Sequence, residues 1–417
     1  MELTRLPNGV RVVTEALADL RSVTLGVWVE NGSRYERPPQ AGISHFLEHL
    51  FFKGTARRTA AQIAEEIDAV GGVLNAFTGK EYTCFYAKVL REHLPLALDV
   101  LADLFTGSRF AEEEIERERS VILQEISQVE DTPDDWVHDL FGLDFWPGHP
   151  LARPIAGTAD TVRHFGRSDF LGFLAERYRP DRVLVAAAGR LEHQAMVEAV
   201  DAAFGRLQGT TPPLDGTAPA PRRVVAVHEK PLEQLHVCLG APGIPQTDPE
   251  RYAAHLMNLA LGGGMSSRLF QEVREKRGKA YSVYSFLSSY RDAGYVGVYV
   301  GTSAAWLREV VELIQIELRR MAREGLTPAE LTRSKNQMKG NMLLGLETSD
   351  SRMSRIAKNE IYHRRDVSVD EIAAAIDAVD NDDVVHVSDR LVGRGALGCT
   401  VLGDLRGQPF DDGVLGA

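Results

Sequence analysis

Cysteine is scarce in this chain, and long apolar runs are absent. The 417 residues include three cysteines, Cys84, Cys238 and Cys399, which lie far apart in the sequence. An odd number of widely spaced cysteines excludes a disulfide framework and a closely spaced zinc-binding thiol cluster. No apolar run is long enough to cross a bilayer, and the first nine residues resemble no signal peptide. We therefore expect buried thiols in a cytoplasmic protein without a membrane partner.

Positive charge is also in short supply. Lysine and arginine together number 47 against 59 for aspartate and glutamate, so the formal net charge is −12. A chain this acidic is a poor ligand for nucleic acid and favours cationic ligands, although the same charge can serve solubility alone. With 44% hydrophobic and 25% charged residues, the composition is that of a globular protein, and the length allows two or three domains.

Histidine is uncommon too, with 12 in the chain, yet two of them share one short apolar segment with a glutamate. The segment 42–52 contains His45, Glu48 and His49. On a helix the two histidines lie one turn apart on the same face, so both imidazoles can reach one metal ion. Glu48 would lie beside that metal, in the position of a general base. This His-x-x-Glu-His order is the inverzincin signature; packing of the helix without a metal is the alternative.

A catalytic zinc ion needs a third protein ligand and an open position for water. The best source is the acidic segment 112–129, which we predict to be a helix. Within it Glu118 and Glu125 are seven residues apart and share a face, so both are candidates. The carboxylates at its start, residues 112–116, are more simply explained as a solvated first turn that suits the helix dipole.

The order of predicted elements repeats along the chain. We expect strands at 4–13, 23–29, 73–78, 82–89 and 182–188, and again at 223–228, 234–239, 281–287 and 295–300. We expect helices at 60–70, 93–105, 112–129, 168–178, 193–204 and 304–323. We also expect helices that begin at residues 133, 249 and 327, and one that ends near residue 276. The segment 347–350 is similar to 131–134 and lies 216 residues after it. This indicates an internal duplication of two α+β halves.

The stretch 209–221 is rich in proline, glycine and threonine and is the expected linker between the halves. The expected domains are therefore a metal-binding catalytic half, 1–208, and a homologous half, 222–417. At the 216-residue offset Glu125 corresponds to Asn341, and the region near Leu261 has no counterpart of the His-Glu-His group. The predicted metal site thus belongs to the first half alone.

Several longer motifs carry a family resemblance. They are the segments 6–9, 42–49 with 52–55, 71–72 with 75–78, 118–126 and 347–352. Over nearly its whole length the sequence resembles the zinc peptidases that include pitrilysin, insulin-degrading enzyme and the mitochondrial processing peptidase. It resembles most the single-chain bacterial relatives of the processing peptidase β subunit. The resemblance implies an α+β fold whose two homologous halves face each other across a peptide cleft.

The resemblance also assigns residues and a reaction. The family's third zinc ligand lies 76 residues beyond the second histidine, the position of Glu125 here, and Glu118 matches a carboxylate that orients a ligand. Zn²⁺ would then be held by His45, His49 and Glu125, with Glu48 as general base. The implied activity is a metalloendopeptidase acting on extended or unfolded peptides. A scaffold of the same fold with a structural metal is the alternative.

Further residues match the family's substrate contacts. Arg274 and Tyr281 correspond to an arginine and a tyrosine that reach the substrate backbone and the tetrahedral intermediate; alone, they would be read as surface and packing residues. The strand with Asn75, Ala76 and Phe77 resembles the edge strand to which the peptide is added. Because one chain carries both residue sets, we expect a homodimer, or a monomer whose halves close. The run 261–270 corresponds to the family's glycine-rich loop but lacks the longer insertion of the processing peptidase α subunit.

Overall fold

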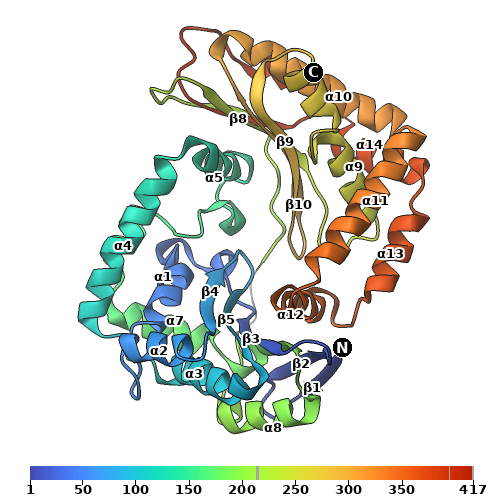
Figure 1. Cartoon of the computed structure of the whole chain (residues 1–417). Coiled ribbons are helices and arrows are strands. Elements are labelled where there is room, and N and C mark those ends of the chain that lie inside the picture. Colours follow the sequence, from blue (N-terminus) through green and yellow to red (C-terminus); the bar gives the residue numbers. More distant parts are fainter. Residues whose placement is uncertain (213–215, 394, 416–417) are drawn as a thin grey trace. The chain divides into compact units, whose positions relative to one another are not determined.

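The structure, a computed structural model, describes residues 1–212, 216–393 and 395–415, which form two compact units (Figure 1). The first unit combines Met1–Gln128, Arg153–Gly216 and Gly345–Asp366. The second unit combines Val129–Ala152, Thr217–Leu344 and Val367–Ala417. Residues 213–215 of the expected linker lie outside the described residues.

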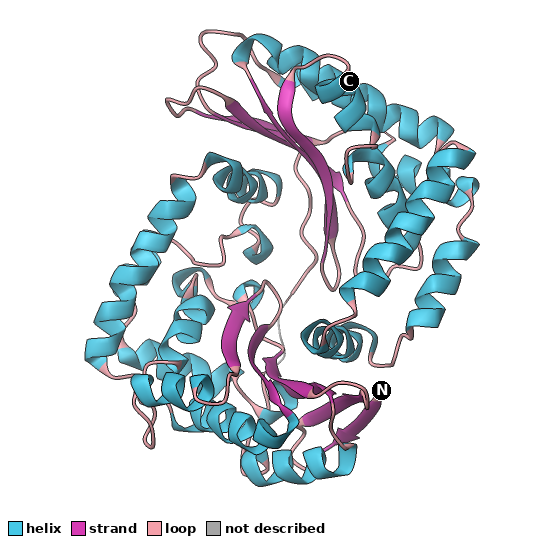
Figure 2. Ribbon diagram, in the orientation of Figure 1, coloured by secondary structure: helices cyan, strands magenta, loops and turns pink. Residues whose placement is uncertain are grey.

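A six-stranded sheet forms the frame of the first unit (Figure 2). Its strands, in spatial order, are β1 (Glu2–Arg5), β2 (Arg11–Ala16), β6 (Val183–Gly189), β3 (Ser22–Val29), β5 (Thr83–Leu90) and β4 (Val73–Thr78). Only the β2–β6 pair is parallel. The single strand expected at 4–13 is wrong: Gly9, with φ of 102°, turns the chain into a β1–β2 hairpin. The strand β4 lies at an edge of the sheet.

Helices cover both faces of this sheet. They are α1 (Ile43–Phe51), α2 (Ala60–Asp68), α3 (Leu94–Gly107), α4 (Glu112–Glu130), α6 (Ala159–His164), α7 (Arg167–Arg177), α8 (His193–Phe204) and α12 (Ser349–Lys358). Phe46 of α1, Leu101 of α3 and Val200 of α8 join the core on one face. On the other face α12 buries Met353 and Ile356 against Trp28. The metal-binding segment is thus a helix whose apolar side is fixed by the core.

The second unit repeats this topology with one strand fewer. Its five strands, in spatial order, are β7 (Val224–His228), β11 (Gly398–Leu402), β8 (Leu235–Pro242), β10 (Gly294–Thr302) and β9 (Ala280–Ser289). Its helices are α5 (Pro133–Phe145), α9 (Arg251–Gly262), α10 (Leu307–Glu324), α11 (Pro328–Gly345), α13 (Val369–Ala378) and α14 (Asn381–Val392). The strand β7 is parallel to β11, and the remaining neighbours are antiparallel, as in the first unit. The predicted α+β duplication is confirmed.

The two units exchange one helix each. The helix α5, from the first half of the sequence, packs its Phe141 and Phe145 on the second unit's sheet. The helix α12, from the second half, packs on the first unit's sheet. The compact units therefore combine parts of both sequence halves. Among the described residues, no helix combines the length and apolar character that crossing a bilayer would require.

Within the first unit, a buried ionic cluster joins the segment after α12 to the sheet. The Arg11 guanidinium on β2 contacts the carboxylates of Glu30 and Glu360, and all three side chains are about 2% exposed. Arg364 adds a second cation at 2.9 Å from Glu30. Since an unpaired buried charge costs several kcal/mol, each member depends on the others.

Candidate metal centre

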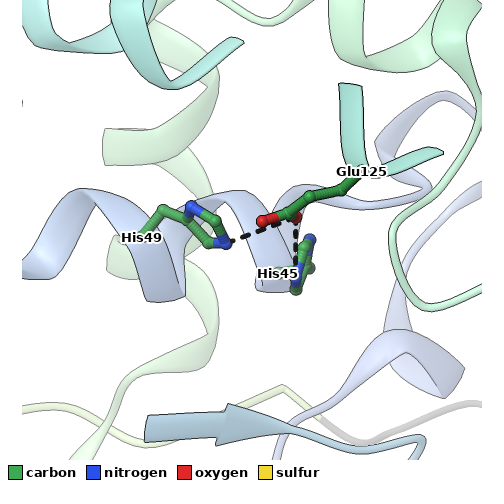
Figure 3. Close-up of side chains that lie close together, drawn as sticks. All are labelled: His45, His49 and Glu125. Atoms are coloured by element: carbon green, nitrogen blue, oxygen red, sulfur yellow. Dashed lines mark ion pairs between the residues drawn. The ribbon is translucent and has the colours of Figure 1, made fainter. Parts of the chain in front are cut away.

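His45 and His49 lie one turn apart on α1, as predicted, and both face Glu125 on α4 (Figure 3). The Glu125 Oε2 atom is 3.8 Å from Nε2 of His45 and 3.6 Å from Nε2 of His49. One ligand atom from each residue lies within 4.8 Å of the other two. Among the described residues, this is the group of histidine, cysteine and carboxylate side chains that can hold a metal ion.

The donor set fits zinc. Bonds of about 2.0–2.2 Å in a tetrahedral site place neighbouring ligand atoms about 3.4 Å apart, close to the 3.8 Å and 3.6 Å that separate Glu125 Oε2 from His45 Nε2 and His49 Nε2. Burial, with the charge of His49 as a smaller cause, lowers the pKa of His45 to about 4, so its imidazole stays neutral and able to bind a metal. The side chains of both histidines are 19% exposed and that of Glu125 is 40% exposed, so solvent reaches the centre.

Glu118 lies behind His49 and does not join the ligand group. Its Oε2 atom is 3.0 Å from His49 Nδ1, and its Oε1 atom is 2.7 Å from Lys53 Nζ. Only 5% of the residue is exposed. A proton held on Nδ1 by this carboxylate leaves the Nε2 lone pair directed at Glu125, the tautomer that metal binding requires. The sequence left open which histidine Glu118 would hold, and the structure places it at His49.

Glu48 lies on the same helix and is held by the sheet. The Thr78 hydroxyl, at the end of β4, donates a 2.5 Å hydrogen bond to Glu48 Oε2. Burial raises the pKa of Glu48, whereas the Thr78 hydrogen bond and the charge of His49 oppose that rise. A carboxyl group whose pKa is raised toward neutrality is suited to taking up and releasing a proton.

A buried carboxylate that the sequence did not reveal caps α1. Glu36 accepts 2.9 Å hydrogen bonds from the backbone N–H groups of Gly42 and Ser44. Burial raises its pKa to about 7, although these two bonds lower it. Gly42 has φ of 94°, and a Cβ there would lie 2.4 Å from the Ala156 carbonyl oxygen, so glycine is required. Capping patterns usually place the acid at the N-cap itself, which is why a distant Glu36 escapes them.

Arg274 and Tyr281 lie together in the second unit. Arg274 belongs to the π-helical segment Phe270–Glu275, and Tyr281 is the second residue of β9. The Arg274 guanidinium lies 4.8 Å from the ring centroid of Tyr281 and 4.8 Å from that of Phe270. Tyr281 is 78% exposed, so it does not have the strand-packing role that its position alone suggests.

The residues Asn75, Ala76 and Phe77 lie on the edge strand β4, as expected. The Asn75 side-chain oxygen accepts a 2.8 Å hydrogen bond from the Ala76 N–H. Phe77 is 36% exposed and packs edge-on against Trp28, with ring centroids 5.4 Å apart. The strand therefore presents an accessible backbone edge that ends beside Glu48.

We expect Glu125→Gln to lose zinc. Glu125 supplies the anionic oxygen of the three-ligand set, beside the imidazole nitrogens of His45 and His49, and an amide cannot supply it. Zinc affinity is therefore expected to fall at least about 100-fold. Zinc per chain, measured by elemental analysis after dialysis, checks this. Glu113→Gln, an exposed change on the same helix, is the control. Equal zinc content in Glu125→Gln and the parent chain would contradict the assignment.

Comparison with known proteins places this geometry in a family. Residues 11–159 match the family described as "Insulinase (Peptidase family M16)", and residues 164–338 match "Peptidase M16 inactive domain". An uncharacterized zinc protease of Streptomyces coelicolor is 46% identical over 94% of this chain and 87% of its own length. The uncharacterized zinc protease YmxG of Bacillus subtilis is 45% identical over 89% of this chain and 91% of its own length.

Solved structures share the fold. A protease from Helicobacter pylori superposes with a TM-score of 0.88 at 22% identity, covering 97% of this chain and 99% of that one. A peptidase M16 inactive domain from Pseudomonas fluorescens gives a TM-score of 0.89 at 19% identity, covering 96% and 98%. The resemblance that the sequence motifs indicate is thereby confirmed, and the chain belongs to peptidase family M16.

Proposed function

We propose that this chain is a zinc-dependent endopeptidase that hydrolyses extended or unfolded peptides. The observation that carries the proposal is the convergence of His45, His49 and Glu125, with Glu48 beside them and held by Thr78. The relatives from Streptomyces coelicolor and Bacillus subtilis are named zinc proteases, which supports zinc as the metal. Three ligands with solvent access suit catalysis better than the four closed ligands of a structural site.

Each residue of the centre then has a distinct task. Zinc in a site of this kind supplies a Lewis acid that acidifies water and polarises a peptide carbonyl. Glu48 takes the proton from the attacking water and returns it to the departing amine. Thr78 fixes the orientation of the Glu48 carboxylate, and Glu118 fixes the tautomer of His49.

The edge strand β4 supplies the binding surface for the peptide. An added strand pairs with the backbone of β4, and the Ala76 N–H, now bonded to the Asn75 side chain, becomes available when that side chain turns away. Such pairing recognises backbone more than sequence, so it selects an extended chain. Arg274 and Tyr281 are proposed to bind the substrate backbone and to stabilise the oxyanion. Cytoplasmic location and homodimer assembly stay predictions.

Chelation tests the proposal. Hydrolysis of an internally quenched peptide by the purified chain is expected to stop with a strong chelator and to return with one equivalent of zinc, because the reaction needs the Lewis acid. Thermal unfolding measured in the same samples separates loss of catalysis from loss of fold. Hydrolysis that continues in the chelated, metal-free chain would contradict the proposal, and so would a zinc-loaded, folded chain that cleaves no peptide in a mixed library.

A further inference from the structure

A groove lies on the face of the first sheet opposite the metal centre. Its volume is about 420 Å³, and it is bounded by the edge-strand residue Phe77, by Tyr86 of β5 and by α12. The helix α12 packs chiefly over β2, β3 and β6. It buries Cys84 of β5 but leaves Tyr86 and the edge-strand residue Phe77 partly exposed on this side, where the groove lies. The wall of the groove therefore comes from the exchanged helix, and the floor from the proposed substrate-binding strand.

Strand geometry directs substrate side chains into this groove. Successive side chains of a strand point to opposite faces, and paired strands share those faces. On β4, Thr78 points toward Glu48 and the metal centre, whereas its neighbour Phe77 points toward Trp28 on the α12 side. A peptide paired with β4 therefore sends alternate side chains to the metal face and to the groove.

The charges around the groove are unevenly paired. Asp350 is 2.8 Å from Lys88 Nζ, and Arg355 contacts Glu15 at 3.2 Å and Asp366 at 3.7 Å. The remaining charged residue of the wall is Lys358, at the end of α12. It is exposed, and its ammonium group has no carboxylate partner among the described residues. Its recorded contact is with the ring of Tyr82, at 6.0 Å from the centroid.

We propose that this groove is a specificity subsite for an acidic side chain of the peptide, and that Lys358 selects it. An aspartate or glutamate that enters past Phe77 and Tyr86 meets the one cation of the wall that lacks an ionic partner. The inference rests on the proposed peptidase function and adds a preference that backbone pairing alone does not give. The positions on either side of the selected residue face the metal side and are independent of Lys358.

Peptide profiling with zinc-loaded full-length protein tests the inference. Quenched peptides that carry Glu, Gln or Lys at each position in turn are compared by kcat/KM, and their binding is measured on Glu48→Gln. The parent is expected to prefer Glu over Gln about two- to fivefold at one position, which is the effect that an exposed ion pair has on a free energy. Lys358→Gln is expected to lose that preference. Lys358→Glu is expected to favour Lys there. The parent's preference should shrink at about 0.5 M salt, because an exposed pair is screened.

Matched variants separate the possible outcomes. Arg163→Gln and Arg163→Glu make the same charge changes at an exposed arginine of α6 and should leave the profile unchanged. If the parent cleaves peptides and Lys358→Glu leaves every positional preference as it was, the subsite is refuted while the peptidase function stands. If the zinc-loaded parent cleaves no peptide, the proposed function fails, and the subsite is then tested by peptide binding to Glu48→Gln. If adding Lys358→Glu to Glu48→Gln leaves its binding preference for Glu unchanged, the subsite is refuted.

Discussion

Glu48→Gln is expected to abolish peptide cleavage while zinc stays bound. The amide keeps the size of the side chain and can still meet the Thr78 hydroxyl, but it cannot take up the proton of the attacking water. General acid–base catalysis of this kind is worth about 10²–10⁴-fold, so kcat/KM should fall by at least that range. The measurement is hydrolysis of a quenched peptide by zinc-replete protein, with zinc per chain determined on the same sample.

The control for this change is Glu65→Gln, an exposed glutamate on α2 that makes the same chemical substitution. It should leave both zinc content and cleavage as in the parent chain. Glu48→Asp keeps the carboxylate but shortens its reach by one methylene, so it should retain more activity than the amide. Full activity of zinc-replete Glu48→Gln would show that another group carries the proton.

The histidine pair of this centre was predictable from sequence, and the third ligand only in part. The spacing of His45 and His49 fixes both on one helical face whatever else the chain does. Glu118 and Glu125 share a face of α4, so helix periodicity does not distinguish them, and only the family resemblance selects Glu125. In the structure, the packing of α4 against α1 places Glu118 at Nδ1 of His49 and Glu125 at the Nε2 atoms.

Other features could not be predicted because they depend on tertiary packing. The strand β11 was missed because it is a five-residue, fully buried central strand and so shows no alternation of polar and apolar residues. The helix expected to end near Lys276 contains the π-helical turn Phe270–Glu275, which apolar spacing does not distinguish from an α-helix. The exchange of α5 and α12 is also invisible, since an amphipathic helix does not specify which sheet it covers.

Ile356→Asp, a change in the second half of the sequence, is expected to unfold the unit that holds the metal centre. Ile356 is fully buried on α12, where it packs with Met353 against Trp28 and Leu184 of the first sheet. Loss of the apolar side chain costs about 2–5 kcal/mol, and burial of an unpaired carboxylate adds to that cost. The total approaches the whole stability of a typical domain, about 5–15 kcal/mol. Urea unfolding and zinc retention measure the effect.

Ile316→Asp is the matched control, because Ile316 is 52% exposed on α10 and the same substitution there buries no charge. Its effect on stability should stay within about 0.5 kcal/mol. If the two halves of the duplicated sequence folded independently, Ile356→Asp would damage the second half and leave zinc on the first. Zinc retained at the parent level in Ile356→Asp would therefore argue against the exchange. Zinc lost together with the cooperative unfolding transition would show that α12 belongs to the folding unit of His45 and His49.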